Sequence, residues 1–193
     1  MCLPKFTEFL DSSIDEQTKV LGTLFEHSDS LIWFTLKNKS FMTRHWAGYI
    51  SFIESIRQRL LELCDDTERE GISSRGVDHL ANIIAAHPKL GEPKQQLSLH
   101  SLDEQKNLTN DDTPEVQQAL SALNREYENI YEGLRFVVFV NGRSRPEIID
   151  VMKRRINSGN TWYDEARLAI REMCDIAEDR ARKYAPECQI HRM

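Results

Sequence analysis

The sequence contains no long hydrophobic stretch. Its longest uninterrupted apolar run, Phe136–Val140, has five residues, whereas a helix that crosses a bilayer needs about 20. The N-terminus, MCLPKFTEFLDSS, also lacks the apolar core of a secretory signal peptide. We therefore expect no membrane among the partners of this protein.

Cysteines are few and scattered. Four are present, Cys2, Cys64, Cys174 and Cys188, and they form no C-x-x-C pair. This distribution is more typical of reduced thiols in an intracellular protein than of disulfides or a zinc site. Motifs for a zinc protease, a serine hydrolase or a phosphate-binding loop are missing as well. The sequence thus predicts no metal site and gives no support for serine hydrolysis.

Positive charge is in deficit, because the formal net charge is -6. A general nucleic-acid binder usually presents a basic face, so we expect no nucleic acid as a partner. A small anionic substrate held by one buried cation remains compatible with this charge.

What the sequence does contain predicts an all-α fold, a compact single-domain multi-helix bundle over residues 1–193. Apolar residues recur at spacings of three and four, the period of an amphipathic helix. Only Phe136–Val140 has strand composition, and no second segment could pair with it, so we predict a buried extended connection there. In the first half of the chain we expect helices over Lys5–Leu10, from Ser13 onward with an apolar face of Ile14, Val20, Leu21, Leu24 and Phe25, and over Arg44–Asp65, where the polar run Asp65–Ser74 breaks the pattern. Ser28–Leu36 is either a helix or an apolar loop. Further helices are expected to end at His87-Pro88, to start at Ser101, to be capped by Thr113 with Pro114, and to span Ser144–Asn157 and Trp162–Lys183.

The last helix carries an arginine on its core-facing side. Its apolar stripe runs from Trp162 through Ala166, Ala169, Met173 and Ile176, and the next member is Arg180. An unpaired buried charge is very costly. Two interpretations stay open: Arg180 snorkels or pairs with a structural carboxylate, or it faces a cavity and binds an anion through both arms of its guanidinium.

The stretch Ala85–Gln105 could bring several polar side chains together. His87 lies where a helix ends and a loop with two prolines begins, and Glu104 and Gln105 lie in the first turn of the next helix. His87 is either a residue of a site or a histidine favoured at a helix C-terminus by the helix dipole. Ser101–Glu104 fits the S-x-x-E capping box, which is compatible with either a structural or a functional role.

Taken together, several segments resemble the 2-oxo-4-hydroxy-4-carboxy-5-ureidoimidazoline (OHCU) decarboxylases. The segments are LGTLFEHSDSL, AAHPKLG, SLDEQ, ALNREYENIYEGLRFVVFVNGRS and EARLAIREMCDIAEDRARK. This resemblance implies an all-helical, cofactor-free, commonly homodimeric enzyme that converts OHCU to (S)-allantoin and carbon dioxide. Because such enzymes are often peroxisomal, we expect a peroxisomal or cytoplasmic location, and His191-Arg192-Met193 loosely resembles a peroxisomal address.

The resemblance also implies which residues form the site. His87 would be the general acid, Glu104 would raise its pKa, and Arg180 would bind a carboxylate or a ring carbonyl; these three are the expected catalytic residues. Glu104 and Gln105 would hold the ureido and ring nitrogens. The expected substrate contacts are Pro88, Ser101, Leu102, Asp103, Glu104, Gln105, Phe136, Val137, Val138, Phe139 and Val140.

Two departures from the family pattern lie beside the expected site. Arg135 stands where the family usually has proline, and Lys89 stands where aspartate is common. Extra positive charge could suit another ureido or imidazoline acid, which is one alternative. The other alternative is a non-catalytic helical module that binds a partner protein, because amphipathic periodicity alone does not report catalysis.

Overall fold

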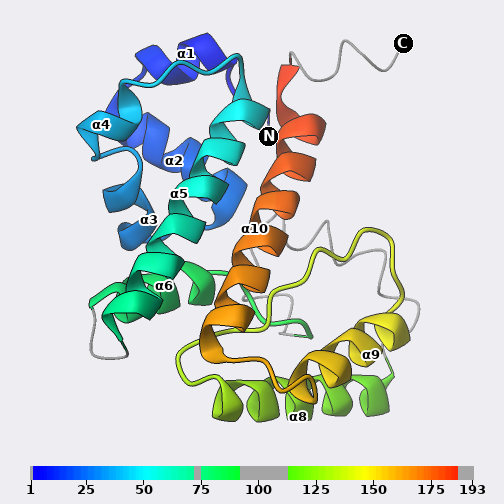
Figure 1. Ribbon diagram of the computed structural model, residues 1–193. Coiled ribbons are helices and arrows are strands. Elements are labelled where there is room, and N and C mark those ends of the chain that lie inside the picture. Colours follow the sequence, from blue (N-terminus) through cyan, green and yellow to red (C-terminus); the bar gives the residue numbers. More distant parts are fainter. Residues whose placement is uncertain (1, 72–74, 92–112, 187–193) are drawn as a thin grey trace.

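The computed structural model describes residues 2–71, 75–91 and 113–186, and within these ranges the chain forms nine helices and no β-strand (Figure 1). The all-α fold class predicted from the sequence is confirmed. The helices are α1 (Phe6–Asp11), α2 (Ile14–Phe25), α3 (Asp29–Phe34), α4 (Lys39–Met42), α5 (Tyr49–Glu70), α6 (Arg75–Ala85), α8 (Pro114–Ile130), α9 (Arg145–Ile156) and α10 (Trp162–Tyr184).

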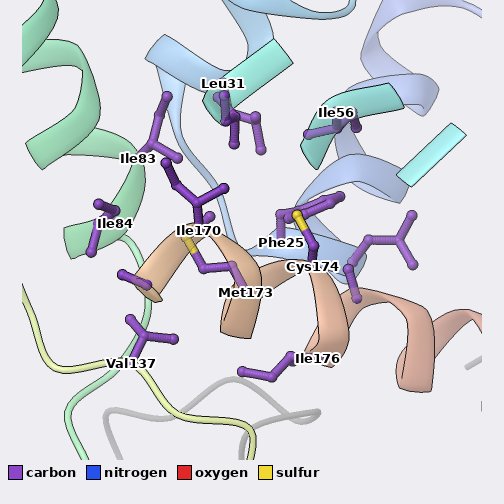
Figure 2. Packing of buried hydrophobic residues seen from close by; sticks show 14 of the residues in the cluster. Phe25, Leu31, Ile56, Ile83, Ile84, Val137, Ile170, Met173, Cys174 and Ile176 are labelled. Atoms are coloured by element: carbon purple, nitrogen blue, oxygen red, sulfur yellow. The ribbon is translucent and has the colours of Figure 1, made fainter. Parts of the chain in front are cut away.

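The long helix α10 is the centre of the bundle. It packs along α5 and also contacts α2 and α6, while α8 and α9 pack against each other (Figure 1). Alanines on its buried face, Ala166, Ala169 and Ala177, have no exposed surface and let the neighbouring helices approach closely. Figure 2 shows side chains of α2, α3, α5, α6 and α10, together with Val137 of the extended segment, meeting in one apolar core. The assignment of all 193 residues to a single domain stays a prediction.

Local sequence signals set several helix starts as predicted. Ser13 and Glu16 form the expected capping box at α2, and Thr113 caps α8 with Pro114 in its first turn. Ser144 and Glu147 form a further capping box at α9. These caps satisfy backbone N–H groups that have no partner within the helix.

The predicted bounds of α5 were wrong at both ends. The helix begins at Tyr49 rather than Arg44, and Trp46 precedes it, with its indole N–H donating to Ser55 Oγ at 2.8 Å. It continues through the polar run to Glu70, because Asp65 and Glu68 form ion pairs with Arg167 of α10. The polar residues of this last turn are therefore held by a neighbouring helix rather than breaking the pattern.

Two smaller features also differ from the expectation. The four-residue helix α4 was not predicted, since its length is too short for a periodic signal. Ile14, expected on the apolar face of α2, is 43% exposed because it occupies the first position of the helix, outside the core. None of the described helices is long and apolar enough to cross a membrane.

The extended segment over residues 135–140 follows α8 and passes beside α10 without pairing as a strand (Figure 1). Phe136, Val137 and Val138 are buried in the core. The Val137 carbonyl accepts a hydrogen bond from Arg155 Nη1 at 2.7 Å, and the Phe139 N–H donates to Glu172 Oε2 at 2.6 Å. The predicted buried extended connection is thus confirmed, and side chains of α9 and α10 hold it.

Candidate active site

His87 lies two residues beyond the end of α6. Its N–H donates to the Ile84 carbonyl at 3.3 Å, and Pro88, which has no N–H, prevents the helix from continuing. The histidine is only 3% exposed, and within the described ranges both buried ring nitrogens have no hydrogen-bond partner. Because a buried polar group without a partner is costly and rare in folded proteins, this ring points to a missing ligand.

The surroundings of His87 keep its ring neutral. Burial, followed by the positive charges of Arg180 and Arg135, lowers the imidazole pKa from 6.5 to about 3. A histidine favoured at a helix end by the dipole would instead be charged and hydrogen-bonded to helix carbonyls. The described part of the chain therefore does not support the helix-dipole interpretation of His87.

Arg180 is buried, as its place on the apolar stripe predicted, with 1% of its surface exposed. Its Nη1 donates to the carbonyls of Thr23 and Leu24 at 3.1 and 3.3 Å, and its Nη2 donates to Glu26 Oε1 at 3.0 Å. The guanidinium thus satisfies carbonyls at the C-terminus of α2 and pairs with a carboxylate. Of the two interpretations, pairing with a structural carboxylate describes these contacts, and the charge still acts on His87.

Arg135 is the second cation at His87. Its Nη1 donates to the backbone carbonyl of His87 at 2.6 Å, and its Nε is buried without a hydrogen-bond partner. Lys89, the other departure from the family pattern, forms an ion pair with Glu128 of α8, with 2.8 Å between Nζ and Oε2. Lys89 is therefore neutralised by α8, whereas Arg135 places a charge beside the histidine.

The extended segment that begins at Arg135 also carries backbone groups of interest. The carbonyls of Phe139 and Val140 accept hydrogen bonds from Arg143. In the described part of the chain, the N–H and carbonyl of buried Val138 have no hydrogen-bond partner. A ligand could bind these two groups, which is the kind of contact expected of this segment.

A buried polar network behind the segment was missed by the sequence reasoning. Glu165 has no exposed surface and accepts hydrogen bonds from Arg155, the Tyr127 hydroxyl and Asn160 at 2.6–2.8 Å. The Arg155 guanidinium also lies 4.5 Å from the centre of the Phe136 ring. The available signal was the spacing of Tyr127 from Leu120 and Leu123, which places it on the buried face of α8, because a buried tyrosine hydroxyl usually has a partner.

The second arm of the expected site, Ser101, Leu102, Asp103, Glu104 and Gln105, lies outside the described residues. The structure therefore brings together His87, Arg135 and Arg180, while the expected role of Glu104 in raising the His87 pKa stays a prediction. Pro88 follows His87 and is half-buried. No group of three His, Cys, Asp or Glu side chains within the described ranges could hold a metal ion.

A separate cavity of about 620 Å³ lies away from His87. It is lined by residues of α5 and α6, the turn at Gly133 and the start of α10, including Glu68, Ala81 and Trp162. No histidine or arginine is among the described residues that line it. This cavity lacks the groups that the expected chemistry requires, so the unpartnered imidazole is the better indicator of the site.

Comparison with known proteins agrees with this geometry. Residues 11–182 match the family model described as OHCU decarboxylase. The chain belongs to the OHCU decarboxylase family. The family resemblance read from the sequence is thereby confirmed. A search of curated protein sequences found no match.

Two solved structures share the fold. A crystal structure of (S)-allantoin synthase superposes with a TM-score of 0.58 at 16% identity, covering 93% of this chain and 54% of that one. A crystal structure of OHCU decarboxylase in the presence of (S)-allantoin gives a TM-score of 0.53 at 21% identity, covering 75% of this chain and 87% of that one. The chain thus spans about half the length of the allantoin synthase.

Proposed function

We propose that the protein catalyses the cofactor-independent decarboxylation of OHCU to (S)-allantoin and carbon dioxide in urate breakdown. The observation that carries this proposal is the buried imidazole of His87, whose two ring nitrogens lack partners beside two guanidinium groups. Membership of the OHCU decarboxylase family supports it, as do the names of the two similar structures. A buried site with cations around a neutral histidine suits an anionic substrate that must receive a proton.

In the first step, the bond between the ring carbon and the carboxylate breaks, and carbon dioxide leaves. The electron pair of that bond stays on the substrate, whose own ring delocalises it. Preorganised donors around developing charge usually contribute the largest share of catalysis. Here the charge of Arg180 and the N–H of Val138, which has no hydrogen-bond partner among the described residues, are the described groups that would stabilise it.

In the second step, His87 delivers a proton to one face of the resulting carbanion or enolate. In the ligand-free protein its ring is neutral, because burial and two arginines lower its pKa to about 3. A substrate carboxylate placed beside the ring would favour the imidazolium and raise this pKa. His87 would then gain its proton as the substrate binds and return to the neutral state after protonating carbon, which yields one enantiomer of allantoin.

Residues outside the described ranges complete the proposal. Glu104 would accept hydrogen bonds from ring or ureido N–H groups and favour the charged form of His87, and Gln105 would bind the ureido group. Ser101, Leu102 and Asp103 would form the rest of this helix start and contribute backbone contacts.

Optical activity tests the proposal directly. Fresh OHCU, generated from urate, decays without assistance to racemic allantoin. We expect the protein to accelerate the reaction and to produce one enantiomer, followed by circular dichroism of the product. Racemic allantoin formed at the unassisted rate would contradict the proposed function, and turnover of a related ureido acid instead would favour the alternative substrate.

The structure bears on the two alternatives. Arg135 and Lys89 both depart from the family pattern. Because Lys89 pairs with Glu128, Arg135 is the one of these two residues that places positive charge at His87. A non-catalytic interaction module would gain nothing from a buried histidine without partners, which costs stability. Decarboxylation therefore remains the better account.

Assembly and location are also proposals. We propose a homodimer, as the family resemblance implies, to be tested by sedimentation equilibrium of the purified protein. His191-Arg192-Met193 lies outside the described residues. Its proposed peroxisomal role predicts that a fluorescent protein ending in these residues enters peroxisomes and that an Arg192→Ala change leaves it in the cytoplasm.

A further inference from the structure

The arginines at His87 differ in how their charges are compensated. Arg180 pairs with Glu26 and donates to two carbonyls. Arg135 donates to one carbonyl, that of His87, and forms no ion pair within the described ranges. A half-buried cation without a counter-ion is costly, because it has lost much of its hydration.

We propose that Arg135 is the residue that binds the carboxylate of the substrate and thereby sets the specificity for a carboxylated ring. This inference rests on the proposed function. It assigns to Arg135 the anion contact that the family resemblance had suggested for Arg180.

Geometry supports this assignment. Arg135 Nη1 is fixed on the His87 carbonyl at 2.6 Å, which anchors the guanidinium next to the residue that carries the unpartnered ring. The buried Nε still lacks an acceptor. Carboxylates are the anions that match the planar donor array of an arginine.

Sequence context makes the contact particular to this chain. Arg135 immediately precedes the buried Phe136, so its backbone belongs to the extended segment expected to contact substrate. Proline, usual at this position in the family, has neither a charge nor a side-chain donor. This chain would therefore recognise the carboxylate with a group that such relatives lack.

The chemistry predicts which kinetic constant depends on Arg135. The carboxylate loses its negative charge as it becomes carbon dioxide, so its attraction to Arg135 is strongest before the bond breaks. An interaction that is no stronger in the transition state than in the bound substrate does not raise kcat. Arg135 should accordingly lower KM without accelerating the chemical step.

The test compares Arg135→Met, Arg135→Lys and the control Lys89→Met, which removes a nearby charge that is already paired with Glu128. For Arg135→Met we expect KM for OHCU to rise at least about tenfold, as for loss of a charge-assisted hydrogen bond. In the same variant we expect kcat to change by less than about threefold. Arg135→Lys should reverse part of the rise in KM. Lys89→Met should leave KM within about twofold of the wild-type value.

Calorimetric titration with two stable probes separates this inference from the proposed function. Allantoate carries a carboxylate and allantoin does not, so Arg135→Met should weaken only allantoate binding. If the wild-type protein discriminates the probes through Arg135 but does not turn over OHCU, the function fails and the carboxylate site stands. The proposal would be overturned if Arg135→Met weakened both probes equally, left the allantoate affinity unchanged, or reduced only kcat. If Arg135→Met does not fold, the same comparison is made with Arg135→Lys.

Discussion

Two buried polar clusters flank the extended segment over residues 135–140, and they differ in completeness. In one, Glu165 accepts four hydrogen bonds from Arg155, Tyr127 and Asn160, and Arg155 also donates to the Val137 carbonyl. In the other, both ring nitrogens of His87 and the Nε of Arg135 are buried and find no partner in the part of the chain that the structure describes. In the complete cluster the donors of Arg155 and both oxygens of Glu165 have partners that support the fold, whereas we propose that substrate satisfies the incomplete one.

This comparison predicts opposite consequences for mutations in the two clusters. Replacing His87 in the incomplete cluster should remove turnover and leave stability nearly intact. A change in the complete cluster should mainly lower the free energy of unfolding.

The largest effect is expected for His87→Gln. Loss of a positioned proton donor typically reduces the rate by about 10²–10⁴-fold, and the remaining allantoin should approach a racemate. Chiral analysis of the product measures the effect, and far-UV circular dichroism should match the wild type. Retained stereoselective turnover would remove His87 from the mechanism.

The second largest effect is expected for Glu165→Gln, and it concerns the stability of the fold rather than the rate of the reaction. This change leaves the buried Arg155 charge without its carboxylate, so we expect a loss of about 3 kcal/mol in the free energy of unfolding. Urea denaturation measures it. The control is Asp66→Asn, which breaks the exposed Asp66–Arg69 ion pair and should cost about 0–1 kcal/mol. If both variants lost the same free energy of unfolding, the Glu165 network would contribute no more to stability than an exposed ion pair.

The third effect concerns the pH dependence of stability. Because the His87 pKa falls from its ordinary value of 6.5 to about 3 on folding, the unfolded chain binds more protons between these pH values. Stability contributed by neutral His87 is therefore present above pH 6.5 and is lost as the pH falls toward 3, by at most about 1.4 kcal/mol per pH unit. Denaturation curves of the wild type and His87→Gln should differ by this slope; parallel curves would mean that the ring is not held neutral.

Sequence patterns predicted those parts of the fold that depend on near neighbours. The cap of Ser13 with Glu16 and the stripe that buries Arg180 both arise within one or two helical turns. The partner of Arg180 was not predictable, because Glu26 is 154 residues away and adopts a positive φ of 64° at the end of α2. Long-range pairing of this kind leaves no periodic signal.

The same limit applies to the site and to α5. Position and residue type marked His87, and the resemblance supplied its role, but the missing partners of its ring are visible only in three dimensions. Arg155 lies in a basic last turn of α9 and gave no sign that it supports Val137. The polar end of α5 was misjudged for a similar reason, since Arg167, about 100 residues away, holds Asp65 and Glu68.

The central claim is that His87 is neutral in the free protein, has no hydrogen-bond partner among the described residues, and responds when a carboxylate ligand binds beside it. The most direct measurement is the ¹H–¹⁵N spectrum of the histidine side chains at about pH 5.5, below the ordinary histidine pKa, with the His87 signals assigned by comparison with His87→Gln. We predict the pattern of a neutral imidazole for His87 in the free protein and a clear change of its signals when allantoate is added. A ring that titrates near its ordinary pKa and does not respond to allantoate would contradict the account.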